Sequence, residues 1–288
     1  MSKILEHLIA LLGLEDLGGD GYRGQSQDLG WGRVYGGQVL GQAVMAAGAT
    51  IEGRRLHSLH SYFVRPGDTT LPIDYQVERV RDGGSFSVRR VVATQSGQPI
   101  FNLSSSFQIA EDGYDHQSAM PDVPGPENIP NEQERARELA DKLPPDVLKR
   151  ATADRPIEMR VVNPDDHFGG SKLEPLRYVW IRANGPVPDD PVVHQCLLAY
   201  ASDWGLLATS LRPHGLSILS RKIQSASLDH AMWFHRDFRI DDWLLYVTDS
   251  PSASGARGFT RGEVYDRQGR LVASAAQEGL IRPRKKPE

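Results

Sequence analysis

The sequence predicts an α+β protein that contains two copies of one unit, an apolar helix followed by antiparallel strands. In the first half, the uncharged stretch Tyr35–Ala49 has helical spacing and precedes several strand-like runs. The same succession returns in the second half at a nearly constant distance. Arg236 follows Arg65 by 171 positions (236 − 65), and Gly269 follows Gly97 by 172 (269 − 97). A constant offset over several elements indicates an internal duplication.

Length and composition set the broad class. The chain has 288 residues, more than the usual domain size of about 100–150 residues. We predict an N-terminal unit over residues 1–115, a linker with a connecting helix over 116–150, and a C-terminal unit with the catalytic residues over 151–288. The formal net charge of −4 argues against a nucleic-acid-binding protein. No apolar run reaches the ~20 residues that a membrane-spanning helix needs.

The elements of the first half follow from hydrophobic periodicity. Residues 2–17 show an amphipathic helix pattern, with apolar side chains at Ile4, Leu5, Leu8, Ile9 and Leu12. Residues 21–34 are rich in glycine and polar side chains and predict a short strand and a loop. The stretch Tyr35–Ala49 is apolar on all sides, which predicts a buried helix. Alternating patterns bounded by turn residues predict strands over Leu56–Val64, Ile73–Arg79, Phe86–Gln95 and Ile100–Ile109.

Composition and periodicity also predict the elements of the linker and of the second half. Asp112–Asn131 is rich in proline, glycine and acidic residues and predicts a linker, while the charged stretch Glu132–Leu148 predicts a solvated connecting helix. Val192–Leu211 predicts an apolar helix that matches the helix of the first half. The predicted strands are Ser225–Phe234, Trp243–Asp249, Ser252–Tyr265 and Leu271–Ile281, the last two joined by a turn at 266–269.

Asp203 is a candidate catalytic base. Helical spacing places it on one stripe with Cys196, Tyr200 and Leu207, which is the apolar face of the predicted helix. Burial of a carboxylate costs several kcal/mol unless the group is paired or hydrogen-bonded. A buried and hydrogen-bonded carboxylate is a candidate base. The alternative is an aspartate that ends or caps the helix, because Gly205 follows closely.

Gln277 is the polar end of an apolar strand face. Strand alternation places Leu271, Ala273, Ala275 and Gln277 on one side of the last strand. Two interpretations are open from this pattern. Either Gln277 marks the point where the strand leaves the core, or its amide points into a functional site.

Ser227 is a weaker candidate when it is taken alone. Alternation places Ser227 and Asp229 on one face of their strand and His230 on the other, so we do not expect a Ser–His pair within the strand. A hydroxyl in a strand is most often structural. The chain contains no Gly-x-Ser-x-Gly motif for a nucleophilic serine. Cys196, the single cysteine, lies among apolar residues and predicts a core position; a lone cysteine excludes an internal disulfide and fits a reducing, cytoplasmic location.

No metal site or cofactor is predicted. The nine histidines show neither His-x-x-x-His nor His-Glu-x-x-His spacing. The glycine-rich stretch 36–41 lacks the Lys-Ser/Thr ending of a phosphate-binding loop.

Four motifs resemble the acyl-CoA thioesterase II family. They are GGQVLGQA at 36–43, HSLHSYFVRPGD at 57–68, DHAMWFHR at 229–236 and SASGARG at 252–258. The resemblance covers nearly the whole chain. It implies a double hotdog fold, in which two long helices are each wrapped by an antiparallel sheet. Together with exposed sheet edges, it also implies a homo-oligomer.

The resemblance further implies an active site and a substrate. In that family an aspartate on the second hotdog helix, a serine or threonine on the following strand and a glutamine on the last strand orient and activate a water. By motif, these residues are Asp203, Ser227 and Gln277. The implied reaction is hydrolysis of a fatty acyl-CoA, the predicted partner of the chain, to free fatty acid and CoA by direct attack of water.

Two other functions are open at this point. A hotdog enoyl-CoA hydratase or dehydratase would need a histidine paired with an acid at the thioester, and His60 and His230 are the candidates. A non-catalytic acyl-CoA-binding protein would bind the substrate without release of thiol. The presence of all three polar residues argues against the second alternative.

Overall fold

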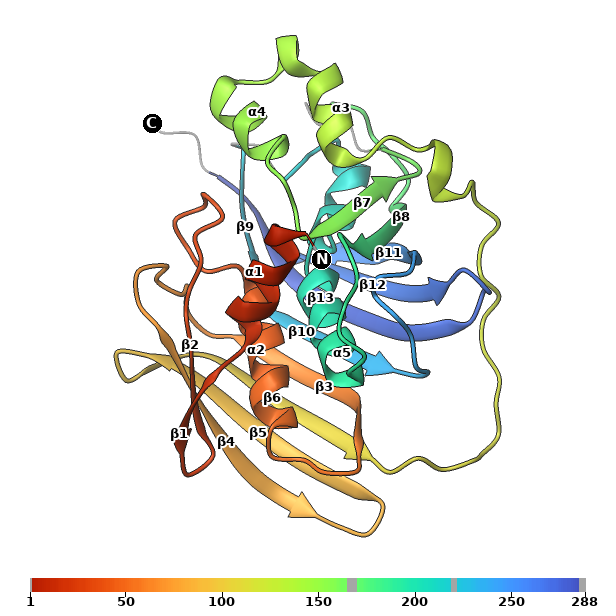
Figure 1. Ribbon diagram of the computed structural model, residues 1–288. Coiled ribbons are helices and arrows are strands. Elements are labelled where there is room, and N and C mark those ends of the chain that lie inside the picture. The colour runs from red at the N-terminus through yellow and green to blue at the C-terminus, as the bar shows by residue number, and fades with distance from the viewer. Residues whose placement is uncertain (1, 165–169, 219–221, 285–288) are drawn as a thin grey trace.

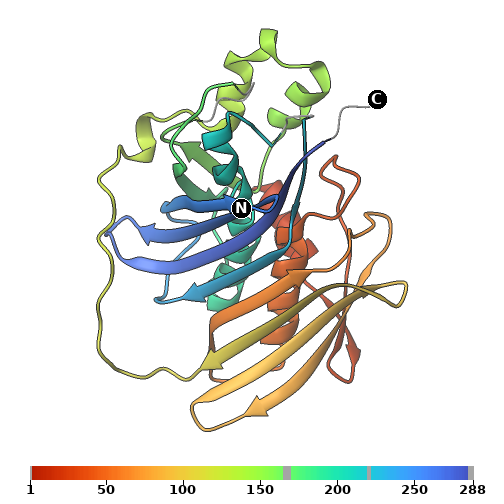
Figure 2. The same ribbon diagram turned by 180° about the vertical axis from the view of Figure 1, so that it is seen from behind.

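One large antiparallel sheet dominates the computed structural model, which describes residues 2–164, 170–218 and 222–284. Thirteen strands in these ranges form the sheet, and helices α2 and α5 lie side by side against it (Figures 1 and 2). Its strands are β1 (Glu15–Gly18), β2 (Gly21–Gly24), β3 (Arg55–Phe63), β4 (Ile73–Asp82), β5 (Phe86–Gln95), β6 (Gln98–Gln108), β7 (Ile157–Val161), β8 (Leu176–Ala183), β9 (Ile223–Ser227), β10 (Asp229–Phe234), β11 (Leu244–Ser254), β12 (Arg257–Asp266) and β13 (Leu271–Pro283).

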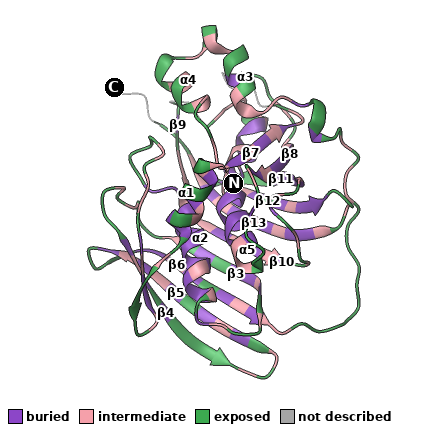
Figure 3. Ribbon diagram, viewed as in Figure 1, coloured by how far each residue is buried: buried purple, intermediate pink, exposed green. Residues whose placement is uncertain are grey.

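The helices divide into a buried pair and several peripheral ones. The α-helices are α1 (Lys3–Leu12), α2 (Gly36–Gly48), α3 (Glu132–Glu138), α4 (Pro145–Ala151) and α5 (Pro191–Ser202). Short 3₁₀ helices are η1 (Pro126–Asn128), η2 (Ala140–Lys142) and η3 (Leu207–His214). Buried residues line α2, α5 and the face of the sheet that they cover, which is the main core (Figure 3).

The strand order makes the internal duplication visible. From the middle of the sheet, one side runs β3-β6-β5-β4-β2-β1 and the other runs β10-β13-β12-β11-β8-β7. His60 on β3 pairs with Ala231 on β10, and the two positions are 171 apart (231 − 60), the offset found between Arg65 and Arg236. A residue therefore pairs with its own duplicate at the centre of the sheet. The α+β class is confirmed, and β3 and β10 join the two copies into one continuous sheet. The division at residues 115 and 150 stays a prediction.

Helices α2 and α5 are antiparallel and unusually close. A Cβ atom added at Gly37 would lie 2.3 Å from the carbonyl oxygen of Tyr200, and the thiol of Cys196 donates to the carbonyl of Gly41 at 3.2 Å. The small residues that the sequence shows in α2 are therefore required by the backbone of α5. This packing brings the N-terminal end of α2 beside the C-terminal end of α5.

Two predicted helices differ from the structure, one in its end and the other in its continuity. The apolar helix 192–211 stops at Ser202, because Gly205 adopts a left-handed conformation (φ 77°) and the 3₁₀ helix η3 follows. The connecting helix 132–148 is broken into α3, η2 and α4, and Pro144 and Pro145 lie at the start of α4. Helix α1 is confirmed over Lys3–Leu12, but Glu15–Gly18, at the end of the predicted helix pattern, forms strand β1. Strands β7 and β8 were not predicted.

The segment that connects the two halves packs against two other parts of the molecule. Residues 120–129 pack on the outer face of the sheet, where Trp180 donates from its indole nitrogen to the carbonyl of Pro124 at 2.8 Å. Helices α3 and α4 lie at one end of the molecule, and strands β4 and β5 reach toward the other (Figures 1 and 2). The guanidinium of Arg155, just after α4, lies 4.3 Å from the centre of the Trp204 ring. The connecting segment therefore reaches the end of α5 that carries Asp203.

Candidate active site

Asp203 lies at the C-terminal end of α5 rather than within it. It occupies the C-cap position with φ −74° and ψ −15°. The prediction of an apolar helical stripe through Asp203 to Leu207 is therefore wrong, because the helix has ended and Leu207 belongs to η3. A Cβ atom added at Gly36 would lie 2.7 Å from Oδ2 of Asp203. The half-buried carboxylate thus faces the first turn of α2, where the helix dipole favours a negative charge.

Gln277 and Ser227 meet Asp203 at a single oxygen. The side-chain amide of Gln277 donates from Nε2 to Oδ1 of Asp203 at 2.8 Å, and the hydroxyl of Ser227 donates to the same oxygen at 3.4 Å. Gln277 is 1% exposed. The structure therefore brings the three predicted residues into one hydrogen-bonded cluster. The alternative in which Gln277 leaves the core is wrong.

An irregularity at Leu228 sets the direction of Ser227. Ser227 pairs with Gly279, but Ala231 pairs with Ala276, so the β9–β10 side holds one more residue than β13 between these two pairs. One extra residue in a strand reverses the alternation of side chains beyond it. Ser227 and His230 consequently share the inner face, and the prediction that they point in opposite directions is wrong.

A second irregularity corrects the predicted face of the last strand. Tyr265 pairs with Leu271 and Val264 pairs with Ala273, which leaves Val272 as an extra residue. Leu271 therefore packs with Tyr265 on the outer face. Ala273, Ala275 and Gln277 keep the predicted inner face.

The two candidate histidines are not placed for acid–base work on a substrate. His60 is exposed on the outer face of the sheet, edge-on to the ring of Trp233 at 5.3 Å. His230 is fully buried, and its Nε2 lies 2.9 Å from the hydroxyl of Ser202. Burial lowers the pKa of His230, although the charge of Asp203 acts in the opposite direction. His230 is thus held as a neutral side chain behind the carboxylate.

Aromatic side chains border the carboxylate on the α3–α4 side. The rings of Trp31 and Trp204 are 5.5 Å apart, and those of Tyr35 and Trp204 are 5.6 Å apart. Burial, together with the charge of Asp203, raises the pKa of Tyr35. The hydroxyl of Tyr35 donates to the carbonyl of Tyr200 at 2.9 Å. No pattern in the sequence predicts this cluster, because its members come from a loop, a helix cap and a turn.

Cys196 and a cavity elsewhere on the molecule do not belong to this site. Burial raises the pKa of the Cys196 thiol, which is 1% exposed and confirmed as a core residue. A cavity of about 660 Å³ lies beside Pro191 and His194, at the opposite end of α5 from Asp203. Among the described residues, no three His, Cys, Asp or Glu side chains gather as metal ligands would.

Comparison with known proteins identifies the family. The family model for an acyl-CoA thioesterase N-terminal domain matches residues 26–108, and that for acyl-CoA thioesterase matches residues 147–280. Acyl-CoA thioesterase 2 of Haemophilus influenzae is 42% identical over 98% of this chain and 99% of its own length. The chain belongs to the acyl-CoA thioesterase II family. Membership confirms the family that the four motifs resemble, and it confirms the prediction of a thioester hydrolase.

Other members and neighbours support the same assignment. Human acyl-coenzyme A thioesterase 8 is 42% identical over 94% of this chain and 88% of its own length. The crystal structure of an acyl-CoA thioesterase II from Mycobacterium marinum is 40% identical, covers 96% of this chain and 99% of its own, and superposes with a TM-score of 0.77. A hot dog protein from Alicyclobacillus acidocaldarius, 20% identical over 98% of this chain and 99% of its own, also has a TM-score of 0.77. The double hotdog fold is confirmed.

Proposed function

We propose that this family member hydrolyses fatty acyl-CoA thioesters to free fatty acid and CoA through a water held by Asp203, Ser227 and Gln277. The observation that supports this mechanism is the shared oxygen Oδ1, which receives hydrogen bonds from both Gln277 and Ser227. When Oδ1 is held in this way, the other oxygen, Oδ2, can accept a hydrogen bond from another group. Oδ2 faces the start of α2. A water between the carboxylate and that helix end can be aimed at a thioester carbonyl.

In the proposed reaction the enzyme forms no covalent intermediate. Asp203 takes one proton as the water oxygen bonds to the carbonyl carbon, and the carbonyl oxygen becomes an oxyanion. When the oxyanion collapses, the carbon–sulfur bond breaks, and the proton held by Asp203 passes to the departing CoA sulfur. The products are one carboxylic acid and one thiol, so atoms and charges balance. Ser227 and Gln277 contribute position, because a fixed water has already lost its freedom of movement.

The oxyanion needs hydrogen-bond donors, and the first turn of α2 is the proposed source. The first N–H groups of a helix have no partner within the helix. Gly36 and Gly37 begin α2, and a side chain at Gly36 would collide with Asp203 and Phe63. Backbone N–H groups at this position, reinforced by the helix dipole, suit an oxyanion that forms next to the attacking water.

The homo-oligomer and the cytoplasmic location remain part of this proposal. The sheet ends at β1 on one side and at β7 on the other. Helix α3 contacts β7, and Arg135 donates to the carbonyl of Val161, whereas the residues of β1 are exposed, so the β1 edge suits assembly with further copies. Light scattering of the purified chain would show whether it is larger than a monomer. Among the described residues, no helix has the length and apolar character needed to cross a membrane.

Asp203→Asn tests the proposed base. The amide cannot take the proton, so we expect turnover to fall by at least about a hundredfold with an unchanged circular dichroism spectrum. Release of CoA thiol from a panel of acyl-CoA chain lengths is the measurement. Asp190→Asn is the matched control, because Asp190 caps the other end of α5 and an asparagine keeps that cap.

The outcomes separate the rival functions. Near-normal thiol release by Asp203→Asn would contradict the proposed base. Hydration of crotonyl-CoA without thiol release would instead identify a hydratase, and saturable acyl-CoA binding without either reaction would identify a binding protein. Acyl groups trapped on Ser227 or Cys196 would show covalent catalysis.

A further inference from the structure

Thr260 stands directly opposite Gln277 in the sheet. The two residues are a cross-strand pair between β12 and β13. Side chains of such a pair point to the same face, with Cβ atoms about 4.5–5.5 Å apart. Thr260 is fully buried and Gln277 is 1% exposed. The hydroxyl of Thr260 is therefore a close neighbour of the amide that holds Asp203.

Each member of the pair has one polar atom without a partner. Among the residues that the structure describes, neither Oγ1 of Thr260 nor Oε1 of Gln277 makes a hydrogen bond. A buried polar atom without a hydrogen-bond partner destabilises the folded protein. The two atoms are complementary, because the hydroxyl can donate and the amide carbonyl can only accept. The amide nitrogen of Gln277 is already used on Asp203.

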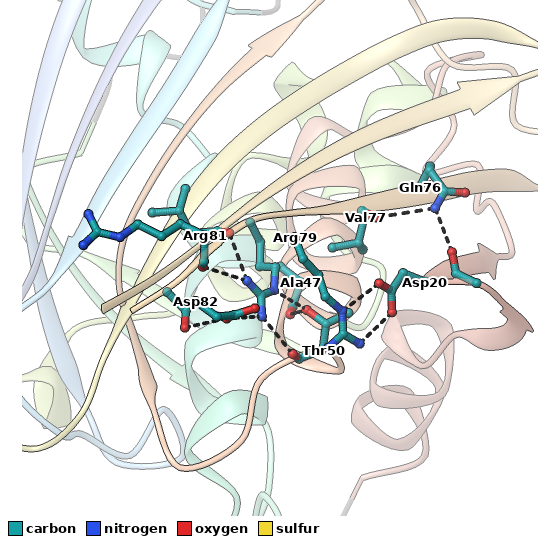
Figure 4. Close-up of polar contacts among 12 residues, drawn as sticks. Asp20, Ala47, Thr50, Gln76, Val77, Arg79, Arg81 and Asp82 are labelled. Carbon is teal, nitrogen blue, oxygen red and sulfur yellow. Dashed lines mark hydrogen bonds and ion pairs between the residues drawn. The ribbon is translucent and has the colours of Figure 1, made fainter. Parts of the chain in front are cut away.

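The pair of positions equivalent to Thr260 and Gln277 in the first half of the chain holds different side chains. Arg89 and Ser105 form the equivalent pair on β5 and β6, 171 and 172 positions before Thr260 and Gln277 (260 − 89 and 277 − 105). Arg89 is buried and donates from Nε to the hydroxyl of Thr50 at 2.8 Å, just beyond the C-terminal end of α2. Figure 4 shows the contacts around Thr50, Arg81 and Asp82 in this network.

Because Thr260 stands where the first half has Arg89, a different side chain lies at the end of the helix in each half. In the first half, the guanidinium of Arg89 donates to the carbonyl of Thr50 at 3.2 Å, two residues beyond the last residue of α2, and a positive charge is favourable near this helix end. In the second half, the side chain at the equivalent position is short, and the longer side chain across the strand, Gln277, reaches the end of α5 instead. Only the second arrangement presents an amide to a carboxylate.

We propose that Thr260 is a positioning residue for Gln277, and that its hydroxyl donates to the carbonyl oxygen of Gln277 in the complex with substrate. Hydrogen bonds in an active site often tighten only in the complex with substrate. With Oε1 held by Thr260, the amide cannot rotate to place its oxygen against Asp203, where two acceptors would repel each other. The proposal rests on the proposed function, because the amide matters only if Asp203 and Gln277 hold the reacting water.

His230 is the competing donor for the same oxygen. It lies on the inner face of β10, next to β13, and its Nδ1 is also without a partner among the described residues. If His230 alone held the amide carbonyl, removal of the Thr260 hydroxyl would leave turnover unchanged. Variants at Thr260 therefore decide between the two donors.

The test compares Thr260→Val with Thr260→Ser and Thr248→Val. Valine keeps the shape of threonine and removes the donor, so we expect kcat to fall about tenfold, with KM changed less than about twofold. Serine keeps the donor and should recover most of kcat. Thr248→Val removes an equally buried hydroxyl on the neighbouring strand, one bonded to Thr209, and should lower thermal stability without this fall in kcat.

A second measurement separates positioning from packing. In a Gln277→Ala background, Thr260→Val should cause no further loss of kcat, because the amide that it positions is absent. An equal loss in both backgrounds, or normal kcat in Thr260→Val alone, would overturn the proposal. If Asp203→Asn and Gln277→Ala themselves keep normal turnover, the proposed water site is wrong. If those two are inactive and Thr260→Val is not, only the role of Thr260 is wrong.

Discussion

Asp203 carries a negative charge at the C-terminal end of its own helix, where the helix dipole is unfavourable for it. Three features of its surroundings compensate. Gln277 and Ser227 donate hydrogen bonds to Oδ1, and the N-terminal end of α2 approaches Oδ2. The same three features define where a water can lie. In the proposed mechanism, stabilisation of the carboxylate and orientation of the water therefore depend on the same contacts.

The two donors should differ in their effect on turnover. The Ser227 hydrogen bond is 3.4 Å long and the Gln277 hydrogen bond is 2.8 Å long. We expect Ser227→Ala to lower kcat about tenfold and Gln277→Ala about a hundredfold, as loss of positioning predicts. Ser227→Thr keeps the hydroxyl and should keep most of kcat. Steady-state thiol release measures all three.

Ser225→Ala is the matched control for this series. Ser225 lies on the same strand, two residues before Ser227, and pairs with Ile281 beyond the site. It should keep normal kcat. A larger loss in Ser227→Ala than in Gln277→Ala would contradict the ranking of the two donors.

The contact between α2 and α5 shapes the site as much as the side chains do. Their antiparallel packing depends on backbone approach at Gly37 and places the first turn of α2 over Asp203. Strand β9 adds Ser227 only because the irregularity at Leu228 turns it inward. The candidate site is therefore assembled from the ends of elements, where small changes of backbone move the three candidate residues.

Gly36→Ala tests the helix contact. The new methyl group would lie 2.7 Å from Oδ2 of Asp203 and 2.9 Å from Phe63, closer than carbon and oxygen atoms can pack. We expect kcat to fall at least about tenfold, because the carboxylate must move. Thiol release and thermal unfolding are measured together.

Gly48→Ala makes the same change at the other end of α2 and serves as the control. Its methyl group would lie 3.2 Å from a methyl group of Val192, a contact that a small shift relieves far from Asp203. We expect normal kcat. Equal activity in the Gly36→Ala and Gly48→Ala variants would show that the first turn of α2 does not set the position of the carboxylate.

The two halves of the molecule carry different polar side chains at their helix ends, although the sheet is nearly symmetric. The paired halves meet at His60 and Ala231, but one helix end holds a buried arginine and the other a carboxylate. The core between them also encloses ionisable groups that differ from one half to the other. His194 and His230 are buried in the second half, and burial lowers the pKa of each.

These histidines predict a loss of stability in mild acid. The unfolded chain binds protons near the ordinary histidine pKa of about 6.5, whereas the folded chain does not bind them until the pH is lower. The stability that depends on neutral His194 and His230 is therefore present above about pH 6.5 and is lost as pH falls through the interval down to their lowered pKa values. The urea midpoint of unfolding should be lower at about pH 5.5 than at about pH 7.5.

His230→Gln should reduce this dependence on pH. A glutamine does not titrate, so the difference between the two urea midpoints should shrink. His116→Gln, in the exposed linker, should leave the difference as it is. An unchanged slope in His230→Gln would show that other groups cause the loss.

Local patterns were enough for most of the fold. The apolar stretch that became α2, the alternating strands and the constant offset between Arg65 and Arg236 each reflect neighbours in the sequence or a repeated pattern. Helix 192–211 was too long in the prediction because its composition stays apolar beyond Ser202, while the left-handed Gly205 ends it. The face of His230 was wrong because alternation takes no account of an extra residue at Leu228.

By itself, the sequence determined the α+β class, the duplication and, through family motifs, the three candidate residues Asp203, Ser227 and Gln277. Only the tertiary structure decided that they share one oxygen, that Gly36 faces that carboxylate and that Thr260 stands behind Gln277. The physical reason is that periodicity describes which face of one element is buried. Contacts between the ends of elements depend on caps, irregular pairs and close backbone approach, which form when the whole chain packs.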